Sequence, residues 1–248
     1  MWFFYIMAAL IGLVIGSFLN ACIYRFPRQI KISKGHSICP RCNHQLSWLD
    51  LFPLFSYLFL GGRCRYCKVK ISPRYPLIEA LTALIYVVLT VKFGLGLATL
   101  GYFIMTAALI IAAFVDLEFM EIPDQATIAL LAAGLILLAT PGDAWLSKVI
   151  GLFVVSVPLL LIAMIGNAMG GGDVKLMAGV GFCIGWQMVI VAFFIGVVAG
   201  GIFAIIKMLY NKADFKTMMP FGPFLVVGTV AVIFWGQNML GWYLTLLR

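Results

Sequence analysis

Two short acidic segments stand next to apolar runs in a chain that otherwise carries few charges. The first is Asp116-Leu-Glu-Phe-Met-Glu-Ile-Pro-Asp124, and the second is Gly170-Gly-Gly-Asp173-Val-Lys175. An ionisable group at the edge of a membrane span is costly to bury, so its presence there indicates a functional site. Two aspartates placed in this way suggest acid and base chemistry.

An aspartate pair of this kind can hydrolyse an amide. Two carboxyl groups a few ångströms apart cannot both ionise easily, so they share one proton. One group then activates water while the other protonates the carbonyl oxygen or the leaving amine. The chain has only two histidines, both far from the acidic segments, and no HExxH motif. The residue types therefore favour the carboxylates over a Ser/His or Cys/His site.

Local structural roles are the alternative explanation for these residues. Asp124 follows Pro123 and precedes an apolar run, which is typical of a helix N-cap. Asp116 ends its span without such a signal. The three glycines before Asp173 allow a close backbone approach, and a flexible hinge is the alternative role. Lys175 could orient Asp173 or pair with a substrate carboxylate, but the preference of basic residues for the cytoplasmic face explains it best.

Residues 23–76 form the only long polar stretch, and they contain two C-x-x-C pairs. These are Cys39-Pro-Arg-Cys42 and Cys64-Arg-Tyr-Cys67, separated by 21 residues. The spacing resembles a four-thiolate zinc ribbon, whose metal would supply the folding free energy that so small a loop lacks. A redox or metal-free loop is the alternative, and a reducing cytoplasm disfavours disulfides.

The remaining histidines and cysteines are expected to have structural roles. His36 and His44 flank the first pair, but four cysteines already complete a tetrahedron, so both histidines are expected at the surface. Cys22 and Cys183 lie in or beside apolar runs without a partner motif. We expect them to pack as small hydrophobic side chains.

The composition predicts an all-α polytopic membrane protein. Of 248 residues, 64% are hydrophobic and 10% are charged, and the mean hydropathy is +1.10. Lipid offers the backbone no hydrogen-bond partner, so each crossing needs a helix of ~20 mostly apolar residues. About eight runs qualify, with the boundary near residue 187 marked only by Trp186-Gln-Met: 2–22, 77–91, 98–115, 126–140, 147–167, 174–187, 188–209 and 221–243.

The distribution of basic residues predicts the orientation of these spans. With eight spans and the N-terminus outside, fourteen Lys and Arg fall on the cytoplasmic side and three on the other. The net charge of +8 then reflects topology and contact with anionic lipid headgroups, not a nucleic-acid surface. In this arrangement Asp116, Asp124 and Asp173 all lie at cytoplasmic helix ends. We predict three parts: a first transmembrane helix (1–22), a cytoplasmic zinc loop (23–76) and a seven-helix membrane domain with the acidic site (77–248).

The ordered set of motifs resembles a known family. Gly170-x-Gly172-Asp173 is similar to the GxGD motif of intramembrane aspartyl proteases. Together with Asp116 and the tetracysteine loop it resembles the type IV prepilin peptidases, particularly those of competence and type II secretion systems. Further matching segments run the length of the chain: Gly16-Ser17-Phe18-Leu19-Asn20, Tyr24-Arg25, Arg74-Tyr75-Pro76-x-x-Glu79, Lys175-Leu176 and Pro220-Phe221-Gly222-Pro223.

The resemblance implies a specific reaction. Members of the family cut the short basic leader from type IV prepilins and pseudopilins at the cytoplasmic face of the bacterial inner membrane. Their catalytic aspartates match Asp116 and Asp173 here, and their active-site loop matches Gly170, Gly172 and Lys175. Many members then N-methylate the new terminus with S-adenosylmethionine. This chain has no recognisable methyl-donor motif, so that second activity follows from the resemblance alone.

A basic leader would be repelled by a loop that carries ten Lys and Arg against one acid, Asp50. We therefore expect an acidic surface for the leader, drawn from Glu79, Glu118, Glu121 or Asp124.

Two other classes of protein use aspartates at a membrane. A transporter would bind protons or cations at Asp116 and Asp173, but it would place them near the bilayer midplane and show repeated halves. A lipid-diphosphate transferase would hold Mg²⁺ with Asp116, Asp124 and Asp173.

Overall fold

The computed structural model describes residues 2–32, 36–39, 41–140, 145–166, 170–211 and 219–246. Within these residues the regular structure is helical apart from two isolated β-bridges, which confirms the predicted all-α class. Four of the basic residues behind the predicted orientation lie outside the described residues: Lys34, Lys212, Lys216 and Arg248.

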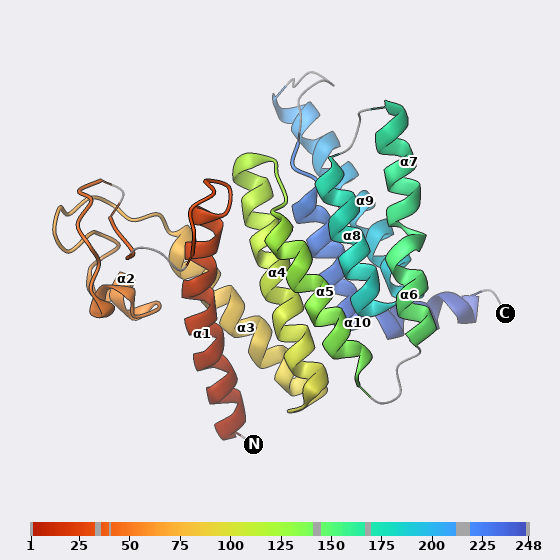
Figure 1. Cartoon of the computed structure of the whole chain (residues 1–248), viewed down its shortest axis with the longest axis horizontal. Helices are drawn as coiled ribbons and strands as arrows, with labels where there is room; N and C mark the ends of the chain where they lie inside the picture. Colours follow the sequence, from red (N-terminus) through yellow and green to blue (C-terminus); the bar gives the residue numbers. More distant parts are fainter. Residues whose placement is uncertain are drawn as a thin grey trace. The chain divides into compact units, whose positions relative to one another are not determined.

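The helices follow one another along the chain, and a long loop that contains two short helices connects the first long helix to the second (Figure 1). The N-terminal part contains α1 (Trp2–Arg25), the 3-10 helix η1 (Trp48–Leu51), α2 (Phe55–Phe59) and α3 (Arg74–Phe93). Next come α4 (Leu97–Phe119), α5 (Asp124–Leu138), α6 (Trp145–Val154) and α7 (Ser156–Gly166). The chain continues with α8 (Gly171–Ile184), α9 (Trp186–Asn211) and α10 (Gly222–Leu246). The described residues of each predicted apolar run therefore lie mainly in one helix, or in the α6 and α7 pair for the run 147–167.

Six of these helical segments are long and apolar enough to cross a membrane, counted over the described residues. They are α1, α3, α4, the α6 and α7 pair, α9 and α10. The pair is interrupted at Val155, because Pro158 has no N–H to donate to the carbonyl of Val154 one turn earlier. The helices α5 and α8 have 15 and 14 residues and are shorter than a ~20-residue crossing.

The boundary between the sixth and seventh predicted spans lies at Gly185, not at Trp186–Met188. Gly185 has φ +82°, a conformation that costs glycine little, and its N–H donates to the carbonyl of Gly181 (2.8 Å). The chain therefore turns one residue before the tryptophan. Trp186 begins the next helix.

The chain divides into two compact units, residues 1–111 and 112–248, called here the N-terminal and C-terminal units. In the N-terminal unit, α1 and α3 cross with their backbones in contact. A Cβ at Gly12 would lie 2.5 Å from the Cα of Ala83, and one at Gly16 would lie 2.6 Å from the Cα of Glu79. Small residues four positions apart permit this approach, as in other membrane helix pairs.

In the C-terminal unit, α8 is the central helix. Eight of its 14 residues are buried, because α5, α6, α7, α9 and α10 all contact it. Its glycines permit close packing: a Cβ at Gly179 would lie 2.8 Å from that of Leu130 in α5, and Gly181 meets Gly151 of α6 backbone to backbone. A short, enclosed helix of this kind can carry a polar site away from lipid.

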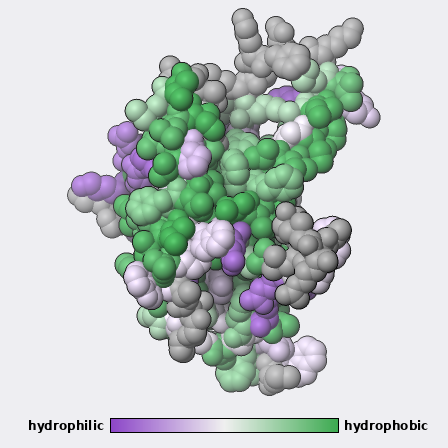
Figure 2. Space-filling view, turned by 90° about the vertical axis from the view of Figure 1, so that its right-hand side faces the viewer, coloured by the Kyte–Doolittle hydropathy of each residue, from purple (hydrophilic) through white to green (hydrophobic). Residues whose placement is uncertain are grey.

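Apolar side chains also cover much of the surface. Figure 2 shows one face of the chain, on which hydrophobic residues predominate. Exposed large hydrophobic side chains occur on all six long segments, for example Phe194 and Leu209 on α9. Such surfaces are stable against lipid tails, so the chain is a multi-pass membrane protein.

Candidate active site and cysteine cluster

Asp116 lies in the last turn of α4 and faces the beginning of α10. The residue is 6% exposed, and its Oδ2 accepts a hydrogen bond from the backbone N–H of Gly222 (2.8 Å). Gly222 is the first residue of α10, where N–H groups have no partner inside the helix and the helix dipole favours negative charge. This hydrogen bond favours the ionised form of Asp116, whereas burial of the carboxyl group opposes it.

Asp173 lies in the first turn of α8 and is 8% exposed. Its backbone N–H donates to the carbonyl of Gly170 (3.1 Å), which begins the helix. No described residue donates a hydrogen bond to its carboxyl group. The charge of Asp116 acts on this carboxyl group, so the two acids lie within electrostatic range although 57 residues separate them. The C-terminal unit thus holds a buried aspartate pair.

The three glycines before Asp173 differ in what surrounds them. A Cβ at Gly172 would lie 3.0 Å from the Cβ of Ile122, in the turn between α4 and α5. A Cβ at Gly170 would lie 3.7 Å from the Oδ2 of Asp173, whereas one at Gly171 would meet open space. The close backbone approach expected from the sequence therefore occurs at Gly172. It joins the start of α8 to the turn that follows Asp116.

Asp124 and Lys175 form an ion pair on the surface. The Nζ of Lys175 lies 2.8 Å from the Oδ1 of Asp124, and both side chains are more than half exposed. The predicted N-cap role of Asp124 is wrong, because Pro123 occupies that position and Asp124 is the first residue of α5. Its carboxylate contacts the lysine instead of a helix N–H. The pair joins α5 to α8 next to the aspartates.

Gly222 is the site residue that sequence reasoning missed. The Pro220-Phe221-Gly222-Pro223 segment was noted only as part of a resemblance. A Cβ at Gly222 would lie 2.8 Å from the Oδ2 of Asp116 and 3.2 Å from its Cγ. A glycine between two prolines at the start of an apolar run was the available signal. Its partner, 106 residues earlier, could not be read from the sequence.

The acids expected to receive a basic leader divide into two groups. Glu79 is buried in the N-terminal unit and accepts a hydrogen bond from the backbone N–H of Leu54 (2.8 Å), so it offers no surface charge. Asp124 is already paired. Glu118 and Glu121 are both exposed, in and just after the last turn of α4. These two are exposed acidic residues that lie close in sequence to Asp116.

In the loop of the N-terminal unit, the four cysteines meet. The Sγ atoms of Cys39 and Cys67 lie 3.8 Å apart, and those of Cys39, Cys42, Cys64 and Cys67 all lie within 4.8 Å of one another. In a tetrahedral site with Zn–S bonds of about 2.3 Å, neighbouring sulfurs are about 3.8 Å apart. The four cysteines are thus close enough to hold a metal ion. Among the described residues no other group of His, Cys, Asp or Glu is so arranged, and the carboxylates form no such cluster.

The two cysteine pairs adopt the same backbone turn. In the first, the N–H of Cys39 bonds the carbonyl of His44 and the N–H of Asn43 bonds that of Cys39. In the second, the N–H of Cys64 bonds the carbonyl of Val69 and the N–H of Lys68 bonds that of Cys64. Asn43 and Lys68 both have positive φ. Burial raises the pKa of Cys39, but N–H groups of Cys42 and Arg41 lower it to about 7. A thiolate is therefore accessible near neutral pH.

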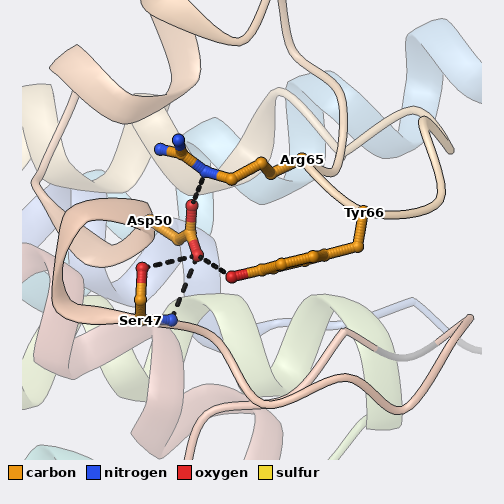
Figure 3. A network of polar contacts seen from close by, with 4 residues as sticks. All are labelled: Ser47, Asp50, Arg65 and Tyr66. Atoms are coloured by element: carbon orange, nitrogen blue, oxygen red, sulfur yellow. Dashed lines mark hydrogen bonds and ion pairs between the residues drawn. The ribbon is translucent and has the colours of Figure 1, made fainter.

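Asp50 links Ser47 to Arg65 and Tyr66, which lie within the second cysteine pair (Figure 3). Its Oδ1 lies 2.6 Å from the Nε of Arg65, and its Oδ2 accepts hydrogen bonds from the backbone and side chain of Ser47 (3.0 and 2.8 Å) and from Tyr66 (3.3 Å). Burial raises the pKa of Asp50, but the bonds from Arg65 and Ser47 outweigh it and hold that pKa below its ordinary range. Because Arg65 and Tyr66 lie between Cys64 and Cys67, this network positions the second pair.

The other histidines and cysteines follow expectation. His44 is exposed and its ring lies 3.6 Å from that of Tyr66, centroid to centroid, and neither histidine belongs to the cysteine cluster. Cys22 and Cys183 are buried and free. The Sγ of Cys183 also contacts the carbonyl of Leu130 (3.2 Å).

Comparison with known proteins identifies the family. The model of the bacterial Peptidase A24 N-terminal domain matches residues 10–93, and that of the type IV leader peptidase family matches residues 103–205. A prepilin leader peptidase/N-methyltransferase of Aeromonas salmonicida (strain A449) is 34% identical and covers 98% of this chain and 95% of its own. The chain belongs to the type IV leader peptidase family. The resemblance predicted from the motifs is thereby confirmed.

Relatives in this family come from distant bacteria. The prepilin leader peptidase/N-methyltransferase of Bacillus subtilis (strain 168) is 32% identical, covering 94% of this chain and 95% of its own. That of Pseudomonas aeruginosa is 31% identical, with coverage of 97% and 93%. No solved structure matches the chain. The leader peptidase model spans both aspartates, and the N-terminal domain model spans the four cysteines.

Proposed function

We propose that this chain is a membrane-embedded aspartyl endopeptidase that removes the basic leader from type IV prepilins or pseudopilins. The observation that carries the proposal is the buried pair of Asp116 and Asp173 in the C-terminal unit. Membership of the type IV leader peptidase family and the names of the relatives support it. Gly170, Gly172 and Lys175 form the active-site loop in this proposal.

The contacts of the two aspartates suggest how they divide the reaction. Asp116 receives the Gly222 N–H and acts as the base, because a hydrogen bond of that kind favours the charged carboxylate. It takes a proton from water as the water oxygen bonds to the scissile carbonyl carbon. Asp173 holds the shared proton and gives it to the carbonyl oxygen. Transfer of a proton to the amide nitrogen then breaks the C–N bond and releases the leader as a carboxylic acid.

The position of the pair fits a substrate with a basic leader and an apolar stem. We propose that the stem lies among the membrane helices while the leader stays in the cytoplasm near Glu118 and Glu121. In this arrangement the N-terminus is outside, the site is at the cytoplasmic face of the bacterial inner membrane, and residues 77–248 carry the protease. With α5 and α8 also counted as crossings, the excess of Lys and Arg on one side of the membrane supports this orientation.

Two further parts of the proposal concern bound groups. The cysteine cluster would hold a structural Zn²⁺, since its sulfur spacing fits a closed tetrahedral site and leaves no open ligand position. The metal would fix the two cysteine turns relative to each other.

N-methylation of the new terminus with S-adenosylmethionine is proposed from the names of the relatives. Transfer of labelled methyl groups to a leaderless pilin peptide tests it.

Leader removal from a co-expressed pilin-like precursor tests the aspartate pair. We expect Asp116→Asn and Asp173→Asn each to lower cleavage by about a hundredfold or more, because each keeps the size of the side chain but cannot share the proton. Membrane insertion should be unchanged. Gln125→Ala is the control, since Gln125 is an exposed residue of α5, and it should cleave within a few-fold of wild type. Cleavage at the wild-type rate by either of the first two variants would refute the proposal.

A further inference from the structure

The middle of the cysteine loop carries a cluster of exposed apolar side chains. In residues 48–59, called here the aromatic segment, Trp48 is 75% exposed, Leu58 71% and Phe59 85%. Leu49, Leu51, Phe52 and Phe55 are exposed as well. Soluble surfaces rarely gather so many large apolar groups, so this surface is expected to contact an apolar partner.

A hydrogen bond fixes the depth of the segment relative to α3. The N–H of Leu54 donates to the Oε2 of Glu79 (2.8 Å), and Glu79 lies five residues after the first residue of α3. At 1.5 Å per residue, that position is about 7.5 Å inside the helix end. The 20 residues of α3 span about 30 Å, the thickness of the hydrocarbon core. Leu54 therefore lies alongside the span.

The turn at Leu54 is held in a conformation that it would not adopt freely. Its φ of 60° and ψ of −51° form a γ-turn, closed by the N–H of Phe55 and the carbonyl of Pro53 (2.6 Å). This turn is rare and strained for a residue with a side chain. Glu79 is itself buried and also accepts a hydrogen bond from the side chain of Ser17 in α1. The aromatic segment is thus tied to α3 directly and to α1 through Glu79.

The charge and the apolar surface of the cysteine loop suit contact with a lipid leaflet. Residues 23–76 carry ten Lys and Arg, and the single acid, Asp50, is paired with Arg65. Beside η1 and α2 there is a hollow of about 450 Å³ whose lining is mostly apolar. Exposed aromatic and aliphatic side chains within a loop rich in Lys and Arg are characteristic of segments that lie in the membrane interface and bind anionic headgroups.

We propose that residues 48–59 are an interfacial segment, which inserts its Trp, Phe and Leu side chains into the leaflet where α3 begins. The cysteine cluster is then held at the membrane surface instead of extending freely into water. Glu79 sets the depth of the segment through Leu54. The inference does not depend on the peptidase reaction, since every residue that carries it lies in the N-terminal unit.

Quenching of Trp48 by brominated lipids tests the proposal in the full-length protein. The chain is placed in nanodiscs that contain phosphatidylglycerol and phosphatidylcholine with bromines at a known acyl position. The emission of Trp48 is the difference between wild type and Trp48→Phe. We expect at least a twofold loss of this emission, strongest with bromines near the headgroup. Trp235, in the middle of α10 and more than half exposed, is the control, and bromines near the bilayer centre should quench it most.

Variants of Glu79 test what holds the segment. Glu79→Ala removes the acceptor of the Leu54 N–H and should reduce quenching of Trp48 at least twofold, whereas Glu79→Gln keeps an oxygen acceptor and should preserve it. Trp48 emission that is unaffected by bromines at every depth would overturn the proposal. Quenching of Trp48 by aqueous acrylamide that stops when a prepilin is added would also overturn the proposal. The surface would then be a site for the substrate stem.

Discussion

At the scale of residues, a single backbone N–H distinguishes the two aspartates of the C-terminal unit. Asp116 accepts it from Gly222 at the start of α10, and Asp173 receives no comparable bond from any described residue. Two side chains of the same chemistry can therefore take different roles, one charged and one protonated. In the proposed reaction this difference gives Asp116 the role of base and Asp173 that of proton donor, as in other paired carboxylates.

Gly222→Ala tests this contact. The new Cβ would lie 2.8 Å from the Oδ2 of Asp116, so the carboxylate must move away from its N–H donor. We expect kcat for leader removal to fall about tenfold to a thousandfold, as when one donor to a catalytic charge is lost, with little change in KM. Gly201→Ala is the matched control, because a Cβ there meets open space. Equal kcat values for the two variants would contradict the role of Gly222.

Glu118 and Glu121 are tested by reversing their charge. Each is exposed and lies close in sequence to Asp116, and a positive leader gains from a negative charge there. Glu118→Lys and Glu121→Lys should raise KM about tenfold for a precursor with a basic leader. A precursor whose leader lysines and arginines are replaced by glutamine should show no such difference. If every variant removes the basic leader at the wild-type rate, these acids do not recognise it.

At the scale of elements, glycines determine how closely the helices approach. The α1 and α3 backbones touch at Gly12 and Gly16, and α8 fits among its neighbours through Gly179 and Gly181. Interiors this dense leave no room for an added methyl group next to a backbone atom. The short helix α8 also carries Asp173, so its packing fixes one half of the aspartate pair.

The crossing of α1 and α3 gives a stability prediction. Gly12→Ala and Gly16→Ala should each lower the free energy of unfolding by about 1–3 kcal/mol, because the helices must separate. Thermal unfolding of the detergent-solubilised protein measures the change. Gly96→Ala, in the same unit but with no atom within 4 Å of its Cβ, should leave stability nearly unchanged. A loss at Gly96 as large as at Gly12 would show that the crossing is not responsible.

The cysteine loop gives a metal-binding prediction. Cys42→Ser and Cys64→Ser should each reduce bound zinc from one atom per chain to well below half, measured by mass spectrometry of the purified protein. Cys183→Ala is the control, since that residue lies in α8 and outside the cluster. Wild-type protein that remains folded and metal-free in chelator would rule out a structural zinc.

At the scale of the whole molecule, the two compact units separate two tasks. The N-terminal unit contains the cysteine cluster and the segment that we place in the membrane interface, and the C-terminal unit contains the aspartate pair. The predicted division at residues 22 and 76 follows polarity, whereas the units follow contacts, with α4 contributing to both. A change from apolar to polar sequence therefore does not have to coincide with the boundary of a compact unit.

The sequence predicted where the helices lie more accurately than where they end. Apolar runs located every long helix, because lipid requires helical backbone wherever the chain crosses. The turn at Gly185 was assigned to Trp186–Met188, since a tryptophan is a more visible signal than one glycine among 25. Asp124 was given a cap role for a similar reason: local patterns do not reveal that Lys175, 51 residues away, forms an ion pair with it.

The sequence by itself determined the membrane class, the family and the closeness of the four cysteines, because composition, ordered motifs and short ligand spacings are local properties. Only the tertiary structure decided that Asp116 accepts a hydrogen bond from Gly222, that Glu79 is buried under Leu54 and that Lys175 pairs with Asp124. Each of these contacts joins residues that are 25 to 106 positions apart. They depend on how the helices pack, which no short stretch of sequence specifies.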